Sequence, residues 1–190
     1  MALERRTIVD AALALLDEVG LEGLSTRALA ARLGVKGPSL YWHFKNMAEL
    51  RDHMAEALLA TALPAPDAFP GDWPAWLADG ARGIRRAALD HRDGARLLAG
   101  ASPTGQHPVL NRDAMVGRLV SEGFKPKEAA GALLGLGRYA LGWALYEQAG
   151  PARSASAAQA FEFGLQAMLA GLAVKVPAAT RVRGTKLRPV

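Results

Sequence analysis

The sequence predicts an all-α protein of about nine helices, with a three-helix head followed by a larger helical body. Apolar residues make up 51% of the chain but aromatic residues only 6%, and the surplus is alanine and leucine, which favour helix over strand. Apolar side chains recur at three- and four-residue spacing, and no segment of the sequence alternates as a half-buried strand does. Proline and glycine clusters separate the periodic segments.

The first helix is expected over residues 3–19, in the head. Its apolar side chains form one stripe, and Gly20 supplies the stop. The apolar run at residues 11–16 is too short for a signal peptide and has acidic residues on both sides, so it is an internal helix face. The stripe consists of Ile8, Ala12, Leu15, Leu16 and Val19.

Residues 24–44 are expected to form two short helices joined by a tight turn. Ser25 can cap the first, because its hydroxyl can accept a hydrogen bond from a free N–H one turn on. Gly34 can end that helix in the left-handed conformation. Pro38 suits the start of the second helix, where the backbone N–H has no partner. Leu40 and Phe44, four residues apart, then face the core of the head.

The outer face of the second helix carries the strongest functional signal. Ser39, Tyr41, Trp42 and His43 remain on or near it, where large aromatic side chains are hard to explain without a partner. From Glu22 to Glu49 the intervening residues include four basic side chains and no acidic one, which indicates a polyanionic partner. The segment therefore predicts a helix-turn-helix that contacts DNA. The basic residues are Arg27, Arg32, Lys36 and Lys45.

Caps and breaks define the helices of the body. Asn46, with Glu49 three residues later, is an asparagine version of the capping box and opens a helix that continues to Leu63. A proline-rich break follows, and Asp72 can cap the next helix. The expected elements after residue 63 are a helix over 73–91, a short one from 93 to 98, one marked by residues 110–119 and ending at 123, a long one over 126–150, a linker at 151–156, and a last helix marked by residues 161–172.

Four glycines in the long helix require an explanation, because each costs about 1 kcal/mol relative to alanine in a helix interior. Close approach of helices is the usual reason, and with the apolar last helix it predicts a four-helix interface between two copies of the chain. The alternative is that the small residues fit around a tight core within one chain. The glycines are Gly131, Gly135, Gly137 and Gly142.

The charge is local. The chain carries a net charge of +5, but five basic residues lie from Lys175 to the C-terminus, and without them 18 basic and 18 acidic residues remain. Residues 176–190 are expected to be an unstructured basic tail, more simply interpreted as a solubilising end than as a DNA-binding arm. The long apolar stretch at 129–146 is interrupted by Arg138 and glycines, which argues against a membrane span and favours a cytoplasmic protein.

No enzyme class is expected. The chain has no cysteine, and its histidines lack partners at metal-ligand spacing. The run from His91 to Asp93 matches the start of a kinase catalytic loop, but that motif needs an asparagine where Leu98 stands. We therefore expect no catalytic residue, no metal site and no cofactor.

Long stretches of the head resemble the TetR family of bacterial transcription regulators: Gly23 to Ala30, Leu33 to Val35 and Pro38 to Asn46. Shorter stretches of the body resemble it too, including His91 to Ala95. The resemblance implies a two-domain homodimer that blocks transcription at a palindromic double-stranded operator until a small molecule binds the body. It implies DNA contacts from Thr26, Arg27, Gly37, Pro38, Ser39, Tyr41, Trp42 and His43.

The chain departs from the repressor after which the family is named. Gly37 replaces a base-reading glutamine and Met47 a lysine, so a different operator sequence is expected. Leu98 replaces the histidine that binds the drug's magnesium ion, and Tyr146 the glutamate that assists it, so a hydrophobic effector, neutral or anionic, bound without metal is expected. Arg138 is the other candidate polar contact, unless it pairs with an acid across an interface. The expected pocket residues are Ile84, Leu98, Met115, Arg138 and Tyr146.

The expected organisation is a DNA-binding domain at 1–46, an effector-binding and dimerisation domain at 47–175, and the tail at 176–190. Effector binding is expected to shift the helix at 47–63 and so change the separation of the two recognition helices. One alternative is a helical small-molecule carrier or scaffold in which the helix-turn-helix is only structural. Another is a DNA-binding protein whose body core is filled and takes no effector.

Overall fold

The computed structural model describes residues 3–67, 69, 72–103, 105, 107–150 and 155–175. These residues form nine α-helices and one short 3-10 helix, and they include no strand, which confirms the all-α prediction. The proline-rich break at Pro70 and Gly71, most of the linker at 151–156 and the basic tail lie outside the described residues. The helices are α1 (Arg5–Gly23), α2 (Thr26–Leu33), α3 (Gly37–Leu40), α4 (Met47–Ala62), α5 (Trp73–Asp90), α6 (Gly94–Gly100), η1 (Pro108–Leu110), α7 (Arg112–Ser121), α8 (Pro126–Ala149) and α9 (Ala155–Lys175).

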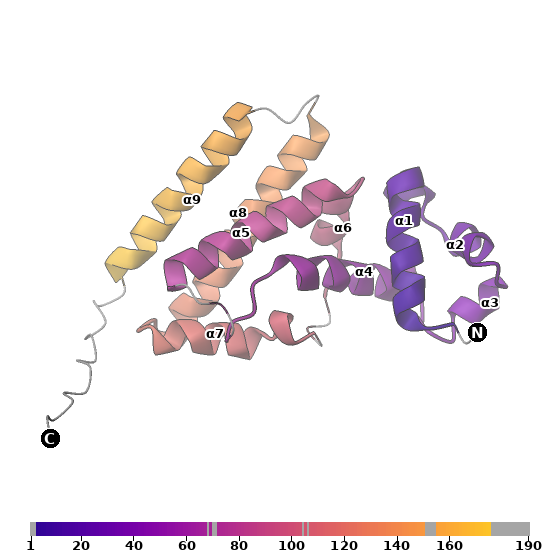
Figure 1. Ribbon diagram of the computed structural model, residues 1–190, viewed down its shortest axis with the longest axis horizontal. Helices are drawn as coiled ribbons and strands as arrows, with labels where there is room; N and C mark the ends of the chain where they lie inside the picture. Colours follow the sequence, from indigo (N-terminus) through magenta and orange to yellow (C-terminus); the bar gives the residue numbers. More distant parts are fainter. Residues whose placement is uncertain are drawn as a thin grey trace, which may run out of the picture.

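The head consists of α1, α2 and α3 at one end of the molecule, and α4 leads from it into the body (Figure 1). The capping predictions for α2 are confirmed: the Ser25 hydroxyl accepts from the Ala28 N–H at 3.2 Å, and Gly34 adopts a left-handed φ of 65°. Leu40 and Phe44 are buried as expected. However, α3 ends at Leu40, so Tyr41, Trp42 and His43 lie in the turn after the helix and not on it.

The predicted stop at Gly20 is confirmed for the first part of α1, because Gly20 has a non-helical φ of 74° and ψ of 177°. The sequence did not predict the further helical turn that follows this kink and ends at Gly23. That turn is held from outside the head, because the Leu21 N–H donates to the Asp93 carboxylate at 2.8 Å. A contact 72 residues away in sequence cannot be deduced from local helix-stop signals.

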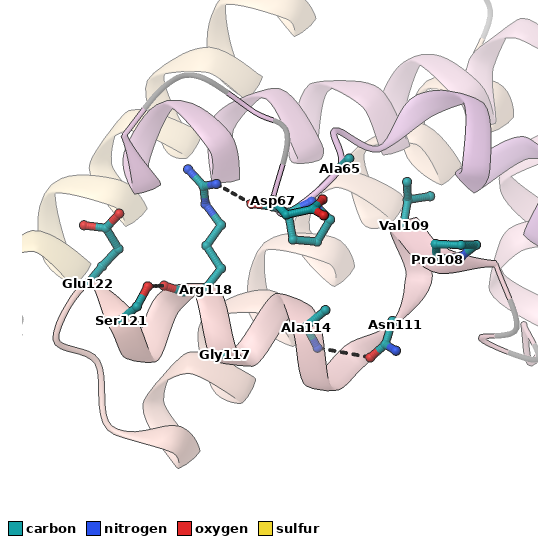
Figure 2. A pocket seen from close by; sticks show the side chains of 11 residues that line it. Ala65, Asp67, Pro108, Val109, Asn111, Ala114, Gly117, Arg118, Ser121 and Glu122 are labelled. Atoms are coloured by element: carbon teal, nitrogen blue, oxygen red, sulfur yellow. Dashed lines mark hydrogen bonds between the residues drawn. The ribbon is translucent and has the colours of Figure 1, made fainter.

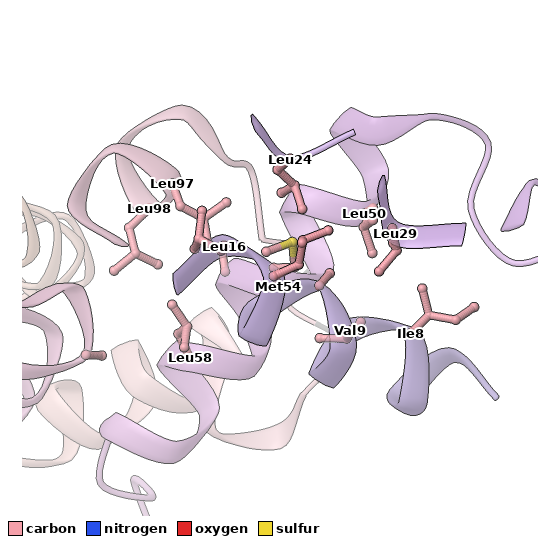
Figure 3. Close-up of a cluster of buried hydrophobic side chains, with 14 of the residues drawn as sticks. Ile8, Val9, Leu16, Leu24, Leu29, Leu50, Met54, Leu58, Leu97 and Leu98 are labelled. Atoms are coloured by element: carbon pink, nitrogen blue, oxygen red, sulfur yellow. The ribbon is translucent and has the colours of Figure 1, made fainter. Parts of the chain in front are cut away.

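One apolar cluster joins the head to the body. Figure 3 shows Leu16 of α1 and Met54 of α4 close to Leu97 of α6 in this cluster. All three side chains are buried. The head is therefore packed on α4 and α6, and it is not an independent domain joined to the body by a flexible linker.

A second apolar cluster forms the core of the body, where α5 packs along α8. Trp73 and Trp76 of α5, Phe124 before α8 and Phe161 of α9 are its aromatic members. Trp73 and Phe124 meet edge to face, with ring centroids 4.9 Å apart. Two bidentate ion pairs fasten α5 to the neighbouring helices: Arg85 to Glu147 of α8, and Arg82 to Glu162 of α9.

The outer faces of α8 and α9 are apolar and uncovered in the single chain. Phe163 is 80% exposed and Tyr146 is 74% exposed. A methyl group on Gly131, Gly135 or Gly142 would meet no atom within 4 Å, so a tight core within one chain does not explain these glycines. The segment Ser156–Val174 is long and apolar enough to cross a membrane by length and composition, and 17% of that window is buried. A second copy of the chain is the simplest cover for such a face in a globular protein.

Candidate nucleic-acid interface and effector cavity

The helix-turn-helix presents its expected DNA-contacting residues at the end of the head distant from α9 (Figure 1). Thr26 and Arg27 lie in the first turn of α2, and Gly37, Pro38 and Ser39 begin α3. The start of α2 and the end of α3 are close together, because Thr26 and Tyr41 line the same small hollow in the head. The predicted contact residues therefore come from two neighbouring helix starts and the turn after α3.

Two aromatic side chains in that turn face solvent. Trp42 is 87% exposed and Tyr41 is 55% exposed, whereas neighbouring Leu40 and Phe44 are buried. A tryptophan left outside an available core adds nothing to folding and exposes a large apolar surface. This arrangement is typical of a side chain that contacts a partner.

The charge around the aromatic pair is positive. Among the described residues Arg27, Lys36 and Lys45 are exposed and form no ion pair, while Arg32 is held by Glu18 at 2.7 Å. The first turn of α2 contains no acidic residue, so its free N–H groups also present partial positive charge. Each of these cations, and the start of α2, can attract a phosphate group.

The body contains a cavity of about 120 Å³ between the end of α4 and helices α5, α7 and α8. Ile84 and Met115, both predicted pocket residues, line it. The only polar side-chain group among its lining residues is the Trp76 indole, whose Nε1–H donates to the Pro64 carbonyl at 3.1 Å. Gly80, a position to which the resemblance assigns a drug contact, also lines the cavity. The other lining residues are Leu63, Pro64, Leu77, Ala81, Leu133, Leu136 and Gly137.

The other three predicted pocket residues lie elsewhere. Leu98 is 8% exposed and belongs to the apolar cluster between head and body. Arg138 and Tyr146 are exposed on the outer face of α8, where they line an open hollow with Trp143. The structure thus brings Ile84 and Met115 together and places Leu98, Arg138 and Tyr146 outside the cavity of the single chain. Exposed sites on α8 could not be distinguished from cavity sites by spacing, because α8 has apolar residues on every face.

A larger open hollow, about 570 Å³, lies between the α4–α5 segment and α7 (Figure 2). The Arg118 guanidinium donates to the Pro66 carbonyl and lies 5.1 Å from the centre of the Trp76 ring. The Asn111 side chain caps α7 by accepting from the Ala114 N–H at 3.0 Å. The Arg118 bond joins the α4–α5 segment to α7, whereas the Asn111 bond lies within α7.

The described residues contain no group of three or more histidine, aspartate or glutamate side chains that could hold a metal ion. At position 98, to which the family resemblance assigns a metal-binding histidine, the buried leucine has no donor atom. The residues present therefore do not fit a magnesium-chelated ligand at this position.

Comparison with known proteins agrees with this geometry. The family model described as "Bacterial regulatory proteins, tetR family" matches residues 8–54, and "Tetracyclin repressor-like, C-terminal domain" matches residues 64–159. The tetracycline repressor protein class A from transposon 1721 of Escherichia coli is 44% identical over 152 residues, which are 78% of this chain and 68% of that protein.

Solved structures of the same kind match more than nine tenths of this chain. A TetR variant from Acinetobacter baumannii AYE in complex with minocycline superposes with a TM-score of 0.81 and 40% identity, over 93% of this chain and 99% of that one. BioQ with its double-stranded DNA operator superposes with a TM-score of 0.74 and 30% identity, over 91% of this chain and 99% of that one.

Proposed function

The chain belongs to the TetR family of bacterial regulatory proteins, and on that premise we propose that its two heads hold a palindromic operator until a small apolar molecule enters the body. The observation that carries the DNA-binding role is the exposed Trp42 in a head that also carries three exposed cations without an ion pair among the described residues. A regulator of this family is a homodimer, and the uncovered apolar faces of α8 and α9 supply the surface for the second copy.

Each proposed DNA contact has a physical role. Arg27 reaches a base edge or a phosphate, and the hydroxyls of Ser39 and Tyr41 donate to phosphate oxygens. Pro38 and Trp42 offer apolar surface to thymine methyl groups or to sugars. Thr26, Gly37 and His43 complete the proposed contact set. Because Gly37 has no side chain to read a base, the operator differs in sequence from that of a repressor with glutamine there.

The effector is proposed to be a small uncharged molecule, since the cavity is apolar and about 120 Å³ in volume. Residues of the cavity itself, Ile84 and Met115 included, are the proposed contacts within one chain. Leu98, Arg138 and Tyr146 contact the effector only if the cavity extends when the dimer forms. No catalytic role is proposed for any residue, and a cytoplasmic location is proposed from the family alone.

The route from effector to DNA passes through the end of α4. Leu63 and Pro64, directly after α4, form part of the cavity wall. A Cβ atom at Gly80 would lie 3.7 Å from the Leu63 side chain, so α5 and this end of α4 are in close contact. A ligand that fills the cavity displaces Leu63, and α4 then carries the displacement into the head. We propose the domain division at residue 46, directly before α4.

DNA binding is tested with the DNA upstream of the chain's own gene, cut into labelled duplexes and titrated by fluorescence anisotropy. The wild-type dimer is expected to select one duplex containing a palindrome. Arg27→Ala is expected to weaken binding at least about tenfold. Arg112→Ala, on exposed α7 in the body, is the matched control and is expected to leave the affinity unchanged. A carrier or scaffold would bind none of the duplexes selectively.

Effector binding is tested by thermal shift with a panel of small uncharged aromatic and aliphatic compounds, and with minocycline plus Mg²⁺ as a comparison. The panel, and not minocycline, is expected to contain a stabilising compound. Gly137→Leu projects a side chain toward the cavity and is expected to abolish the shift. Gly117→Leu on α7, where a Cβ atom meets nothing within 4 Å, is the matched control. Stabilisation by minocycline with Mg²⁺ alone would contradict the proposed ligand class.

A further inference from the structure

The head has a second connection to the body besides α4. The turn between α5 and α6 binds the C-terminal part of α1 through polar contacts. The Asp17 carboxylate accepts from the Arg92 N–H at 2.9 Å and contacts His91 Nδ1 at 2.9 Å. The Arg92 guanidinium donates to the Glu18 carbonyl at 2.8 Å. We name residues 91–93 the clamp turn.

The kink in α1 packs closely against the clamp turn. Asp93 has a left-handed φ of 56°, and among the described residues no other non-glycine residue has a positive φ. Its carboxylate accepts from the Leu21 N–H at 2.8 Å, one residue after the kink at Gly20. A Cβ atom at Gly20 would lie 2.8 Å from that carboxylate and 3.0 Å from Arg92 Nε. The two sides of this contact thus have a left-handed aspartate and a conformation that glycine adopts without a Cβ clash, so the two backbones can approach closely.

The opposite side of the clamp turn is held by one side chain of α8. The Gln148 carbonyl oxygen accepts from the Ala95 N–H at 3.0 Å. The Gln148 amide nitrogen donates to the carbonyls of Ala88 and His91, each at 2.8 Å. Both amide hydrogens of Gln148 are therefore used, and they fix the end of α5 and the clamp turn to α8. The carbonyl oxygen of the same side chain fixes the start of α6.

α8 is also a wall of the effector cavity. Leu133, Leu136 and Gly137 of α8 line the cavity, and Gln148 lies eleven residues after Gly137 on the same helix. A rigid helix transmits a displacement along its length, and packed elements change between discrete arrangements. The hydrogen bonds of Gln148, the clamp turn and Leu21 thus form a continuous path from α8 to α1 that does not pass through α4.

We propose that Gln148 is a positioning residue for DNA binding: it transmits the position of α8 through the clamp turn to α1 and so sets the angle of the head on the body. The proposal rests on the proposed function, because a head angle matters only if two heads must match one operator. The effector cavity would then be connected to the head by two paths, one through α4 and one through Gln148, the clamp turn and Leu21.

The test measures head position without DNA or effector, so its failure is distinct from a failure of the proposed function. The chain has no cysteine, so Ala31→Cys, on exposed α2, gives one spin label per protomer in the full-length dimer. Gln148→Leu is expected to broaden the distribution of label-to-label distances measured by double electron–electron resonance. Tyr139→Phe removes another hydrogen bond of α8, to the Phe161 carbonyl at 2.8 Å, and is expected to leave the distribution unchanged.

Hydrogen exchange distinguishes positioning from general loss of stability. The Leu21 amide, bonded to the clamp turn, is expected to exchange at least about tenfold faster in Gln148→Leu. The Leu29 amide in the head core, bonded to the Ser25 carbonyl at 2.9 Å, is the reference and is expected to change much less. If Gln148→Leu does not fold, Gln148→Glu keeps the acceptor for Ala95 and loses the two donors. An unchanged Leu21-to-Leu29 ratio and distance distribution in the folded variant would overturn the proposal.

Discussion

The carbonyl oxygen of Ala62 packs directly against Gly83, so that the last residue of α4 and the backbone of α5 are in contact with no side chain between them. A methyl group on Gly83 would overlap this oxygen. Because the overlapping atom is backbone, a side chain cannot rotate away to relieve the overlap. The contact fixes the end of α4 beside the effector cavity.

Gly83→Ala is therefore expected to destabilise the protein by about 1–3 kcal/mol, the usual range for overpacking. Gly80→Ala, one turn earlier on α5, is the control: its Cβ would meet the Leu63 side chain at 3.7 Å, an ordinary contact. Urea unfolding of both variants measures the difference. Equal free energies of unfolding for the two variants would contradict the prediction, because they would show that the backbone at Ala62 can move away from the added methyl group at little cost.

Trp42→Ala is expected to weaken operator binding at least about tenfold and to leave the free energy of unfolding nearly unchanged. The first effect follows from loss of a base or sugar contact, at about 1–3 kcal/mol for a good contact. The second follows because Trp42 is almost fully exposed. Anisotropy titration and urea unfolding measure the two quantities. A large loss of stability would instead assign Trp42 to the core of the head.

The two ion pairs of α5 provide a matched comparison. Glu147→Ala leaves Arg85, with 21% of its side chain exposed, without its bidentate partner, and is expected to cost about 3–5 kcal/mol. Glu162→Ala breaks the more exposed pair with Arg82, 41% exposed on each side chain, and is expected to cost about 0–1 kcal/mol. Hydrogen bonding to these carboxylates raises the pKa of both arginines, so each remains charged in the folded chain. Denaturant unfolding that ranks the variants in the opposite order would contradict this assignment.

The Leu21 N–H and, more weakly, Arg96 lower the pKa of Asp93 below its ordinary value. A carboxyl group with a depressed folded-state pKa adds stability above its unfolded pKa, and this contribution disappears as the pH falls through the folded value. Wild type is therefore expected to lose stability below about pH 4 more steeply than Asp93→Asn. Urea unfolding between about pH 2 and pH 6 tests this, and parallel curves would contradict it.

The sequence predicted most of the fold because local signals set most helix ends. Ser25, Asn46 and Asp72 each accept from the backbone N–H three residues on, as the capping patterns predict. The helical turn after Gly20 was missed because Leu21 is held by Asp93, a tertiary bond that local signals do not show.

The candidate sites were predictable to different degrees. An exposed aromatic pair in an acid-free window is visible in the sequence, and the structure exposes Tyr41 and Trp42. The cavity was harder to predict from the sequence, because its walls come from four separate segments and apolar residues cover every face of α8. The hydrogen bonds on which the proposed role of Gln148 rests could not be predicted from the sequence, since its partners lie 53 to 60 residues away.

The salt dependence of operator binding tests the central claim most directly. Arg27, Lys36 and Lys45 from two heads provide up to about six phosphate contacts, and each contact adds about −0.9 to the slope of log K against log salt. The wild-type dimer is expected to bind a palindromic duplex from its own upstream region with a slope steeper than about −4, and the triple alanine variant with a much smaller slope. Binding that is independent of salt, or equal for palindromic and scrambled duplexes, would contradict the account.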